Sequence, residues 1–517
     1  MNKQAIKESI VVSAQQMADI EGRIFDQGMP VPALMEKAAG LCFREIINLY
    51  PLSKVSTVGV LAGLGHNGGD ALVVARELHL AGYQVKVCRP LTKLKELTAS
   101  HAEYAASLGI PFAEEIDSLQ ECELIIDGLF GFGLTRPIEG NLAETVNKLN
   151  SWCKPVVSID LPSGINTDTG ETLGTAVKAT YTLCLGLWKR AFFQDEALEY
   201  IGKAIKLDFG IPEADIKAVV GEELIQQLTP SIAKQFLPLP RPPVTHKYKQ
   251  GTLLLVCGSR RYPGAAILNA LGARGSGVGM LSVAVPQSLK DLIISQLPES
   301  LVVGCPETES GAIDSIPLSD DELAQFDTIA IGSGLTTEAQ PVIKRILNYN
   351  CPIVLDADGL NIVAKLASGN PQDVLNASSG IRIVTPHPGE FKRLFPNIGN
   401  PENNRIQAAQ KAAKESNAIV LLKGGRTVIA HPDGTMWLIP QSTPALARGG
   451  SGDVLTGLLS GLVAQQKNLS SDINDMFNTV ALAAYWHAQA GIKAAQERTE
   501  LGVDAYTLSQ YLNRVNW

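Results

Sequence analysis

Long stretches of uniform character are missing from this 517-residue sequence. No segment reaches the roughly 18 apolar residues that a membrane-spanning helix needs, and residues 1–20 lack the continuous apolar core of a secretory signal. No block of like charge occurs, and the net charge is only −8 at pH 7. These absences disfavour a membrane anchor or a nucleic-acid-binding surface, so we expect a cytoplasmic protein that binds neither membranes nor nucleic acids.

Paired cysteines and aromatic residues are also scarce. The 8 cysteines are scattered and none forms a Cys-x-x-Cys pair, which favours buried free thiols over a zinc site or a disulfide framework. Aromatic residues make up 6% of the chain, whereas hydrophobic residues as a whole reach 45% and glycine contributes 47 residues. This composition is typical of an aliphatic-rich globular protein with many strand-to-helix turns, and the length predicts more than one domain.

The first half of the chain alternates short apolar strands with helical patterns. Helical periodicity covers residues 11–50, and a strand at 57–62 leads into a glycine-rich turn, a helix and a second strand, which together form a βαβ unit. Further strands are predicted at 124–127, 156–160, 180–185 and 204–207. Such alternation predicts a doubly wound, parallel α/β sheet.

Four prolines within residues 237–244 (LPLPRPPV) interrupt this pattern, since neither a helix interior nor a central strand accommodates them. A second α/β series follows, with strands predicted at 252–257, 279–285, 328–331, 353–356, 382–385 and 418–423, then a hairpin at 427–430 and 436–439, then long helices. We therefore predict a first domain at 1–228, a proline-rich linker at 229–244 and a second domain at 245–517, each a Rossmann-like, three-layer α/β fold.

Three loops of the first half place polar groups directly after predicted strands: GHNGGD at 65–70, DGLFGFG at 127–133 and DLPSG at 160–164. Because the carboxyl ends of parallel strands form the ligand crevice, these loops should converge on one pocket. Asp127 and Asp160 offer carboxylates for acid–base chemistry, and oxygens of Asn67, Asp127 and Ser163 suit an alkali or alkaline-earth ion. Each aspartate alone is equally consistent with a helix N-cap, but three loops together favour a site.

The second half carries five comparable loops: IGSGL at 331–335, LDADGLN at 355–361, TPHPGEF at 385–391, LLKGG at 421–425 and GGSGDVLTG at 449–457. The last opens an apolar helical run, so its N–H groups lie at a helix N-terminus, where phosphate oxygens bind. Lys423 adds a positive charge and Asp453 a carboxylate, which a phosphoryl-transfer site requires. Singly, a solvated lysine and a turn capped by Asp453 remain alternatives. GxxxxGK[ST] is absent, so this is not a P-loop protein.

On its three loops the first half resembles the NAD(P)H-hydrate epimerase family, whose pattern combines GxGNNGGDG, D-x-x-F-G-x-G and D-x-P-S-G. The resemblance implies inversion at C6 of a hydrated dihydropyridine ring, with Asp127 or Asp160 moving the proton, and a potassium ion on Asn67, Asp127 and Ser163. The implied contacts to the hydrated nucleotide are His66, Asn67, Gly68, Gly69, Asp70, Gly131, Phe132, Gly133, Leu134, Thr135, Arg136, Pro137 and Asp160.

On its five loops the second half resembles the ribokinase-like fold and, within it, the ADP-dependent NAD(P)H-hydrate dehydratase family. The resemblance implies ADP and Mg²⁺, with Asp453 acting on the C6 hydroxyl that phosphorylation converts into a leaving group. Implied contacts to the hydrated nucleotide are Gly334, Thr385, Pro386, His387, Pro388, Gly389, Glu390, Phe391 and Asp453. Implied contacts to the adenine nucleotide are Lys423, Gly424, Gly425, Arg426, Thr427, Thr443, Pro444, Ala445, Leu446, Ala447, Arg448, Gly449, Gly450, Ser451 and Gly452. TPALAR at 443–448 departs from the family's NPGMAT-like segment.

We therefore predict a bifunctional, homo-oligomeric enzyme that epimerises the R and S hydrates of NADH and NADPH and dehydrates the S form with ADP. One alternative is a ribokinase-like kinase for a pyrimidine or thiazole with an N-terminal binding domain, because GGSGD alone fits either reaction. A second alternative is a nucleotide sensor without turnover. TPHPGEF and the fusion to an epimerase-like half favour the repair enzyme. The residues themselves do not separate ADP from ATP, although the resemblance favours ADP.

Overall fold

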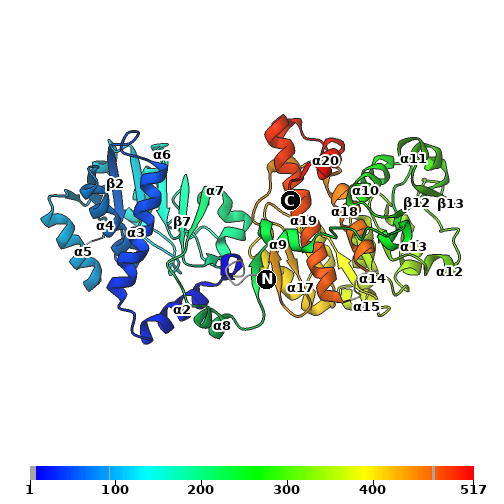
Figure 1. The fold of residues 1–517 in the computed structure, drawn as a ribbon, viewed down its shortest axis with the longest axis horizontal. Coiled ribbons are helices and arrows are strands. Elements are labelled where there is room, and N and C mark those ends of the chain that lie inside the picture. The colour runs from blue at the N-terminus through cyan, green and yellow to red at the C-terminus, as the bar shows by residue number, and fades with distance from the viewer. Residues whose placement is uncertain (1–6, 92, 468–471) are drawn as a thin grey trace. The chain divides into compact units, whose positions relative to one another are not determined.

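Two separate sheets organise the chain. The computed structural model describes residues 7–91, 93–467 and 472–517. Within it, contacts divide the chain between Glu222 and Glu223 into two units, each built around its own sheet with helices beside it (Figure 1). All eight cysteines are free thiols, and seven of them are buried. Among the described residues, no helix combines the length and the apolar character needed to cross a bilayer.

The first unit contains a seven-stranded parallel sheet in the order β4-β3-β2-β5-β6-β7-β9. Its strands are β2 (Thr57–Ala62), β3 (Gln84–Cys88), β4 (Phe112–Ala113), β5 (Leu124–Gly128), β6 (Val156–Ile159), β7 (Tyr181–Leu185) and β9 (Lys203–Leu207). A separate parallel pair joins β1 (Val11–Val12) to β8 (Trp188–Lys189). The helices are α2 (Ala14–Asp26), α3 (Val31–Leu49), α4 (His66–Leu80), α5 (Glu96–Ser107), α6 (Gly140–Ser151), α7 (Leu198–Ile201) and α8 (Glu213–Val220).

The central strands of this sheet are buried along their length, as parallel strands covered on both faces require. The chain runs from β2 to β3 on one side and then returns to β5 on the other. This reversal opens a crevice at the carboxyl ends of β2 and β5, where the GHNGGD and DGLFGFG loops begin.

The second unit contains a ten-stranded sheet in the order β10-β19-β18-β17-β16-β15-β14-β11-β12-β13. Its strands are β10 (Ile225–Gln227), β11 (Thr252–Val256), β12 (Met280–Pro286), β13 (Leu301–Cys305), β14 (Thr328–Ile331), β15 (Ile353–Leu355), β16 (Arg382–Val384), β17 (Ile419–Leu422), β18 (Val428–Ala430) and β19 (Met436–Leu438). The helices are α9 (Pro230–Phe236), α10 (Pro263–Ser276), α11 (Lys290–Gln296), α12 (Asp320–Leu323), α13 (Gln340–Ile346), α14 (Asp358–Ala367), α15 (Pro371–Leu375), α16 (Pro388–Leu394), α17 (Arg405–Ser416), α18 (Ser451–Lys467), α19 (Ile473–Arg498) and α20 (Ala505–Tyr511).

Only β18 pairs antiparallel with its neighbours among the described strands of this sheet, and the predicted hairpin of β18 and β19 is confirmed. Helix α18, which carries GGSGD, packs tightly against α10. Glycines permit this approach: a Cβ at Gly457 would lie 1.8 Å from the carbonyl oxygen of Asn269. The observed architecture confirms the predicted α/β fold class.

The division between the units differs from the predicted boundaries of 1–228 and 229–244. Residues 225–236 form β10 and α9 of the second unit, because Ile225 pairs with Met436 of β19 and Ile232 lies in the second core. A three-residue strand carries little periodic signal, and its partner lies some 200 residues downstream. Local sequence therefore did not reveal that this segment belongs to the second sheet.

Candidate active sites

A cavity of about 660 Å³ occupies the crevice of the first unit, a volume suited to a nucleotide-sized ligand. Loops after β2, β5, β6 and β7 line it together with α2 and α3. The predicted nucleotide-binding residues found in its wall are His66, Asn67, Asp70, Gly131, Phe132, Gly133, Leu134, Thr135, Arg136 and Asp160. Of the other predicted residues, Gly68 and Gly69 are buried within α4, and Pro137 is exposed outside the lining.

The first turn of α4 faces this cavity. The helix begins at His66 after Gly65, and its opening N–H groups give the cavity wall a partial positive charge that suits an anion. Gly68 is required for this placement, since a Cβ there would lie 2.1 Å from the carbonyl oxygen of Gly63. The GHNGGD motif thus brings a helix N-terminus hard against the end of β2.

Asp160 stands in the cavity wall with an ion-pair partner that the sequence did not identify. Lys189 Nζ lies 2.5 Å from Asp160 Oδ1, and the N–H of Phe132 donates to Oδ2 at 3.0 Å. Burial opposes the charge on Lys189, but the Asp160 carboxylate outweighs burial and raises the pKa of the ammonium group. Asp160 also has a φ of 68°, a conformation that is uncommon for a non-glycine residue. Lys189 was missed because it lies in a two-residue strand outside every motif.

Asp127 is placed differently, although it stands at the head of the DGLFGFG loop. Its carboxylate is completely buried and is absent from the cavity lining. Ser163 donates to it twice, from Oγ at 2.6 Å and from N at 2.9 Å, and Ser158 Oγ donates at 2.8 Å. Burial raises the pKa of Asp127, and the hydrogen bonds from the two serines oppose that rise. Asp127 therefore ties the loops after β5 and β6 together behind the cavity wall.

Asn67 lies beside this arrangement. A Cβ at Gly131 would be 3.2 Å from Asn67 Oδ1 and 3.1 Å from Asp160 Oδ2, so both side chains face the same glycine. The Nδ2 group of Asn67 is buried without a hydrogen-bond partner. The carboxamide, carboxylate and hydroxyl oxygens at Asn67, Asp127 and Ser163 are hard ligands of the kind that an alkali cation accepts.

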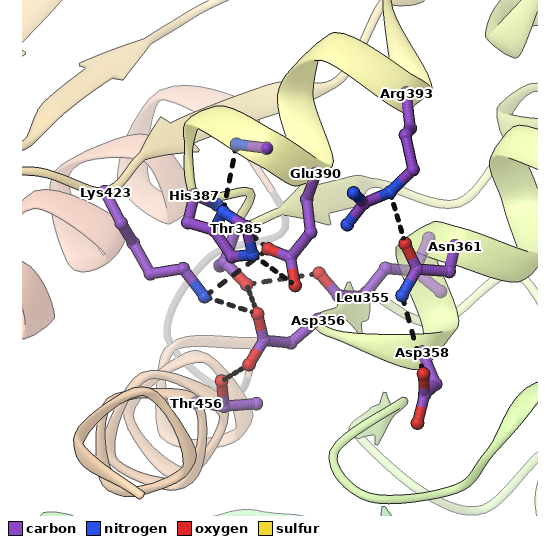
Figure 2. Close-up of polar contacts among 11 residues, drawn as sticks. Leu355, Asp356, Asp358, Asn361, Thr385, His387, Glu390, Arg393, Lys423 and Thr456 are labelled. Carbon is purple, nitrogen blue, oxygen red and sulfur yellow. Dashed lines mark hydrogen bonds and ion pairs between the residues drawn. The ribbon is translucent and has the colours of Figure 1, made fainter. Parts of the chain in front are cut away.

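In the second unit, polar residues from three segments converge on Asp356, which is 2% exposed and follows β15 (Figure 2). Lys423 Nζ lies 2.7 Å from Asp356 Oδ1, Thr385 Oγ1 donates to the same oxygen at 2.8 Å, and Thr456 Oγ1 donates to Oδ2 at 2.8 Å. Burial favours the protonated acid, but Lys423 and the hydroxyl donors outweigh it and lower the pKa of Asp356. The LDADGLN, TPHPGEF and LLKGG loops are thereby fixed to α18.

The TPHPGEF loop is further held by a capping box at the start of α16. His387 Nδ1 accepts from the N–H of Gly389 at 3.0 Å, and the N–H of His387 donates to Glu390 Oε2 at 2.9 Å (Figure 2). Glu390 is buried and lies 3.9 Å from Lys423 Nζ, whereas half of the His387 side chain is exposed. The predicted substrate loop therefore presents an accessible imidazole on a rigid turn.

Asp453 lies in the first turn of α18, which begins at Ser451. Burial and the nearby charge of Asp356 raise its pKa to about 7, while a hydrogen bond from Ser333 and the charge of Lys423 oppose the rise. A Cβ at Gly452 would lie 3.6 Å from Lys423 Nζ, so the ammonium group reaches the helix N-terminus. The structure thus joins the IGSGL, LLKGG and GGSGD loops around one carboxyl group whose pKa is raised by burial.

The segment 443–448 makes mainly structural contacts. Thr443 caps the short 3₁₀ turn Pro444–Leu446, Ala445 is buried in the core, and Arg448 donates to the carbonyl oxygens of Leu501 and Val503. The residues of these two sites that the prediction omitted are Asp356 and Thr456, together with Lys189, Lys95 and Glu21 in the first cavity. Asp356 and Thr456 had a usable signal, because they stand in the LDADGLN and GGSGDVLTG motifs; the other three had none.

These two sites define a two-domain α/β enzyme that acts on nucleotides. A family model described as NAD(P)H-hydrate dehydratase matches residues 253–514, and one described as YjeF-related protein N-terminus matches residues 31–191.

Whole-length relatives are found as well. The chain is 54% identical over 503 residues to the bifunctional NAD(P)H-hydrate repair enzyme Nnr of Synechocystis sp., covering 97% of this chain and 94% of that protein. It is 49% identical over 493 residues to the protein of the same name from Thermosynechococcus vestitus, covering 95% and 94%. A solved ADP/ATP-dependent NAD(P)H-hydrate dehydratase from Bacillus subtilis, co-crystallised with ATP and Mg²⁺, is 31% identical and covers 53% of this chain and 92% of that chain, at a TM-score of 0.43.

The chain therefore belongs to the family of bifunctional NAD(P)H-hydrate repair enzymes. Its N-terminal unit is the epimerase half and its C-terminal unit the dehydratase half, which confirms the predicted function.

Proposed function

We propose that the cavity of the first unit is where the R and S hydrates interconvert, and that Asp160 rather than Asp127 exchanges the proton. The observation that carries this assignment is the placement of the two carboxylates: Asp160 lines the cavity, whereas Asp127 is sealed behind it. Asp160 also forms a buried ion pair with Lys189, at the edge of the cavity where a base is needed. The first turn of α4 is suited to the phosphates of the nucleotide.

We propose that the second unit carries out the dehydration around Asp453. This carboxylate takes the proton from the C6 hydroxyl, and the alkoxide oxygen forms a bond to the terminal phosphoryl group as its bond to the nucleotide breaks. The lone pair on N1 then expels phosphate from C6, and loss of a proton from C5 restores the double bond. A base with a pKa of about 7 suits this task at neutral pH. Lys423 follows β17, and its ammonium group reaches the N-terminus of α18, where it is placed to neutralise phosphate charge.

The phosphoryl donor is proposed to be ADP with Mg²⁺, as the dehydratase half of the family implies. Among the described residues no group of three or more His, Cys, Asp or Glu side chains forms a metal cage. A magnesium ion carried mainly by the nucleotide phosphates fits this arrangement, and bound there it would neutralise charge on the transferred group. Potassium is proposed at Asn67, Asp127 and Ser163, where it would stabilise the loops that shape the first cavity.

One experiment tests both halves. Purified enzyme is given a mixture of R and S hydrates with Mg²⁺ and either ADP or ATP, and recovery of NAD(P)H absorbance is followed. Complete conversion with ADP is expected, because epimerisation converts the R form into the S form, which the dehydratase half consumes. Recovery that stops when the S form is exhausted would refute epimerisation, and no recovery with either nucleotide would refute dehydration. Faster recovery with ATP would overturn the proposed donor. Self-association remains a prediction, for which light scattering gives the test.

A further inference from the structure

Glu21 is a carboxyl group in the epimerase cavity that none of the motif loops contains. It lies on α2, which begins with a capping box between Ser13 and Gln16 and buries Met17, Ile20 and Ile24 in the core of the first unit. Glu21 follows Ile20 and lines the cavity. Within the described part of the chain, its carboxyl group makes no hydrogen bond or ion pair. An acidic side chain is thus held at a ligand cavity with no structural partner to explain it.

Two further carboxyl groups line the cavity together with Glu21. Asp70 and Asp160 line the same cavity, and Lys189 is buried against Asp160. Burial, together with Asp160, raises the pKa of Glu21 to about 7 against the pull of Lys189. Burial raises the pKa of Asp70 well above its ordinary range, and both Asp160 and Glu21 add to the effect. Glu21, Asp70 and Asp160 thus line one cavity, and of the three only Asp160 is given an ion pair with the buried Lys189.

Other charged groups face the cavity from the neighbouring loops. His66 begins α4, Lys95 precedes α5, and Arg136 follows the DGLFGFG loop. The pKa of His66 is lowered by burial and by the charge of Lys95. Lys95 and Arg136 suit the phosphates of a nucleotide, whereas the carboxyl groups of Glu21, Asp70 and Asp160 are suited to proton exchange.

We propose that Glu21 is the general acid of the epimerisation and that Asp160 is its base. This inference rests on the proposed placement of the reaction in this cavity. Glu21 gives its proton to the C6 hydroxyl oxygen as the C6–O bond breaks, water leaves, and the N1 lone pair forms an N1=C6 double bond. Water then adds to C6 from the opposite face, giving one proton to Asp160 while its electron pair forms the new C6–O bond. Exchange with solvent returns a proton to Glu21 and removes one from Asp160 between turnovers.

Two carboxyl groups in contrasting environments are what this chemistry needs. An unpaired carboxyl in an apolar wall retains its proton, whereas a carboxylate paired with a buried ammonium loses it. Asp70 is less suited to the acid role, because it is only 8% exposed and burial raises its pKa well above the ordinary range of an aspartate. Glu21 is accessible to the cavity and releases its proton near neutrality.

The test compares Glu21→Gln with Asp19→Asn in the full-length protein. Asp19 is an exposed carboxylate on the same helix and serves as the matched control. The purified R hydrate is supplied with ADP and Mg²⁺, so that NAD(P)H appears only after epimerisation, and the S hydrate reports dehydration alone. For Glu21→Gln we expect conversion of the R hydrate to fall by roughly 10²-fold or more, with conversion of the S hydrate unchanged. Asp19→Asn should match the wild type on both hydrates.

The pH profile separates an acid from a structural residue. Wild-type epimerisation should decline as pH rises through about 7, since Glu21 then loses its proton. In Glu21→Gln the residual rate should show no such decline, and Glu21→Asp should restore part of the rate together with a decline. A wild-type rate in Glu21→Gln, or a reduced rate that keeps the wild-type profile, would overturn the proposal. Full epimerase activity in Asp160→Asn would instead show that the reaction does not use this cavity as proposed.

Discussion

Replacing Asp356 with asparagine tests how the second site controls the charge of Asp453. The Asp356 carboxylate accepts three hydrogen bonds of 2.7–2.8 Å and is 2% exposed, so its charge acts in a medium of low dielectric constant. That charge, after burial, is the second cause of the raised pKa of Asp453. Asparagine keeps the size and one acceptor oxygen of the side chain but removes the charge.

The expected result is a displaced pH profile. Because Asp453 acts as the base, wild-type dehydration should be lost as pH falls through about 7. Without the charge of Asp356, the pKa of Asp453 falls, so the acid limb of the variant's rate profile should lie at a lower pH than that of the wild type. Maximal turnover should also fall, since Lys423 loses the partner that holds its ammonium group in place.

The variant should also be less stable. Removing one partner of a buried ion pair costs about 3–5 kcal/mol. The Lys423 side chain is 20% exposed and asparagine retains an acceptor, so we expect about 3 kcal/mol or less, equivalent to a fall in melting temperature of roughly 10 °C at most. Calorimetry at neutral pH measures this loss, and the second unit should account for it.

The assay is the initial rate of S-hydrate conversion with ADP and Mg²⁺ across about pH 5 to 9, with both hydrate and nucleotide saturating. Asp320→Asn is the control, because Asp320 pairs with Arg345 at the surface with 81% of its side chain exposed. This control should change neither the profile nor the melting temperature. A uniform loss of rate in Asp356→Asn at every pH, with the acid limb unmoved, would refute the electrostatic argument.

Four further substitutions are informative. Asp453→Asn should lower S-hydrate conversion by roughly 10³-fold while R and S forms still interconvert, as chiral separation of the hydrates would reveal; loss of both activities in a folded variant would contradict two separate sites. Asp160→Asn should lower interconversion of the R and S forms while leaving S-hydrate conversion intact. Asp127→Asn should mainly lower the melting temperature of the first unit, because it disturbs the hydrogen bonds that tie two loops together. Gly457→Ala places a Cβ 1.8 Å from the carbonyl oxygen of Asn269, so dehydration should fail and the second unit should lose at least about 2 kcal/mol; a wild-type melting temperature would show that the helices can separate without cost.

The local patterns in the sequence were sufficient for most strands of four or more residues and for the loops that follow them, whereas β1, β4, β8, β10 and β13 were not predicted. Strand β2 was predicted at its observed bounds, and GGSGD was correctly expected to open a helix. Such features depend on a few adjacent residues: apolar side chains that fill the interior of a parallel sheet, and glycines that let a turn or a helix approach another backbone. The same local signals were enough to indicate an α/β enzyme with two sites.

The tertiary structure alone decided which side chains face each other in those sites. Thr456 and Asp356 are 100 residues apart in the chain, and Glu21 reaches the cavity of Asp160 from a helix near the N-terminus. Asp127 and Asp160 both end strands with similar motifs, yet one is sealed by serine donors and the other lines the cavity. Burial and the distance between charges determine protonation, and both depend on how distant segments pack. The sequence therefore determined which acidic and basic side chains were available, and the packing determined which of them lie together in a site.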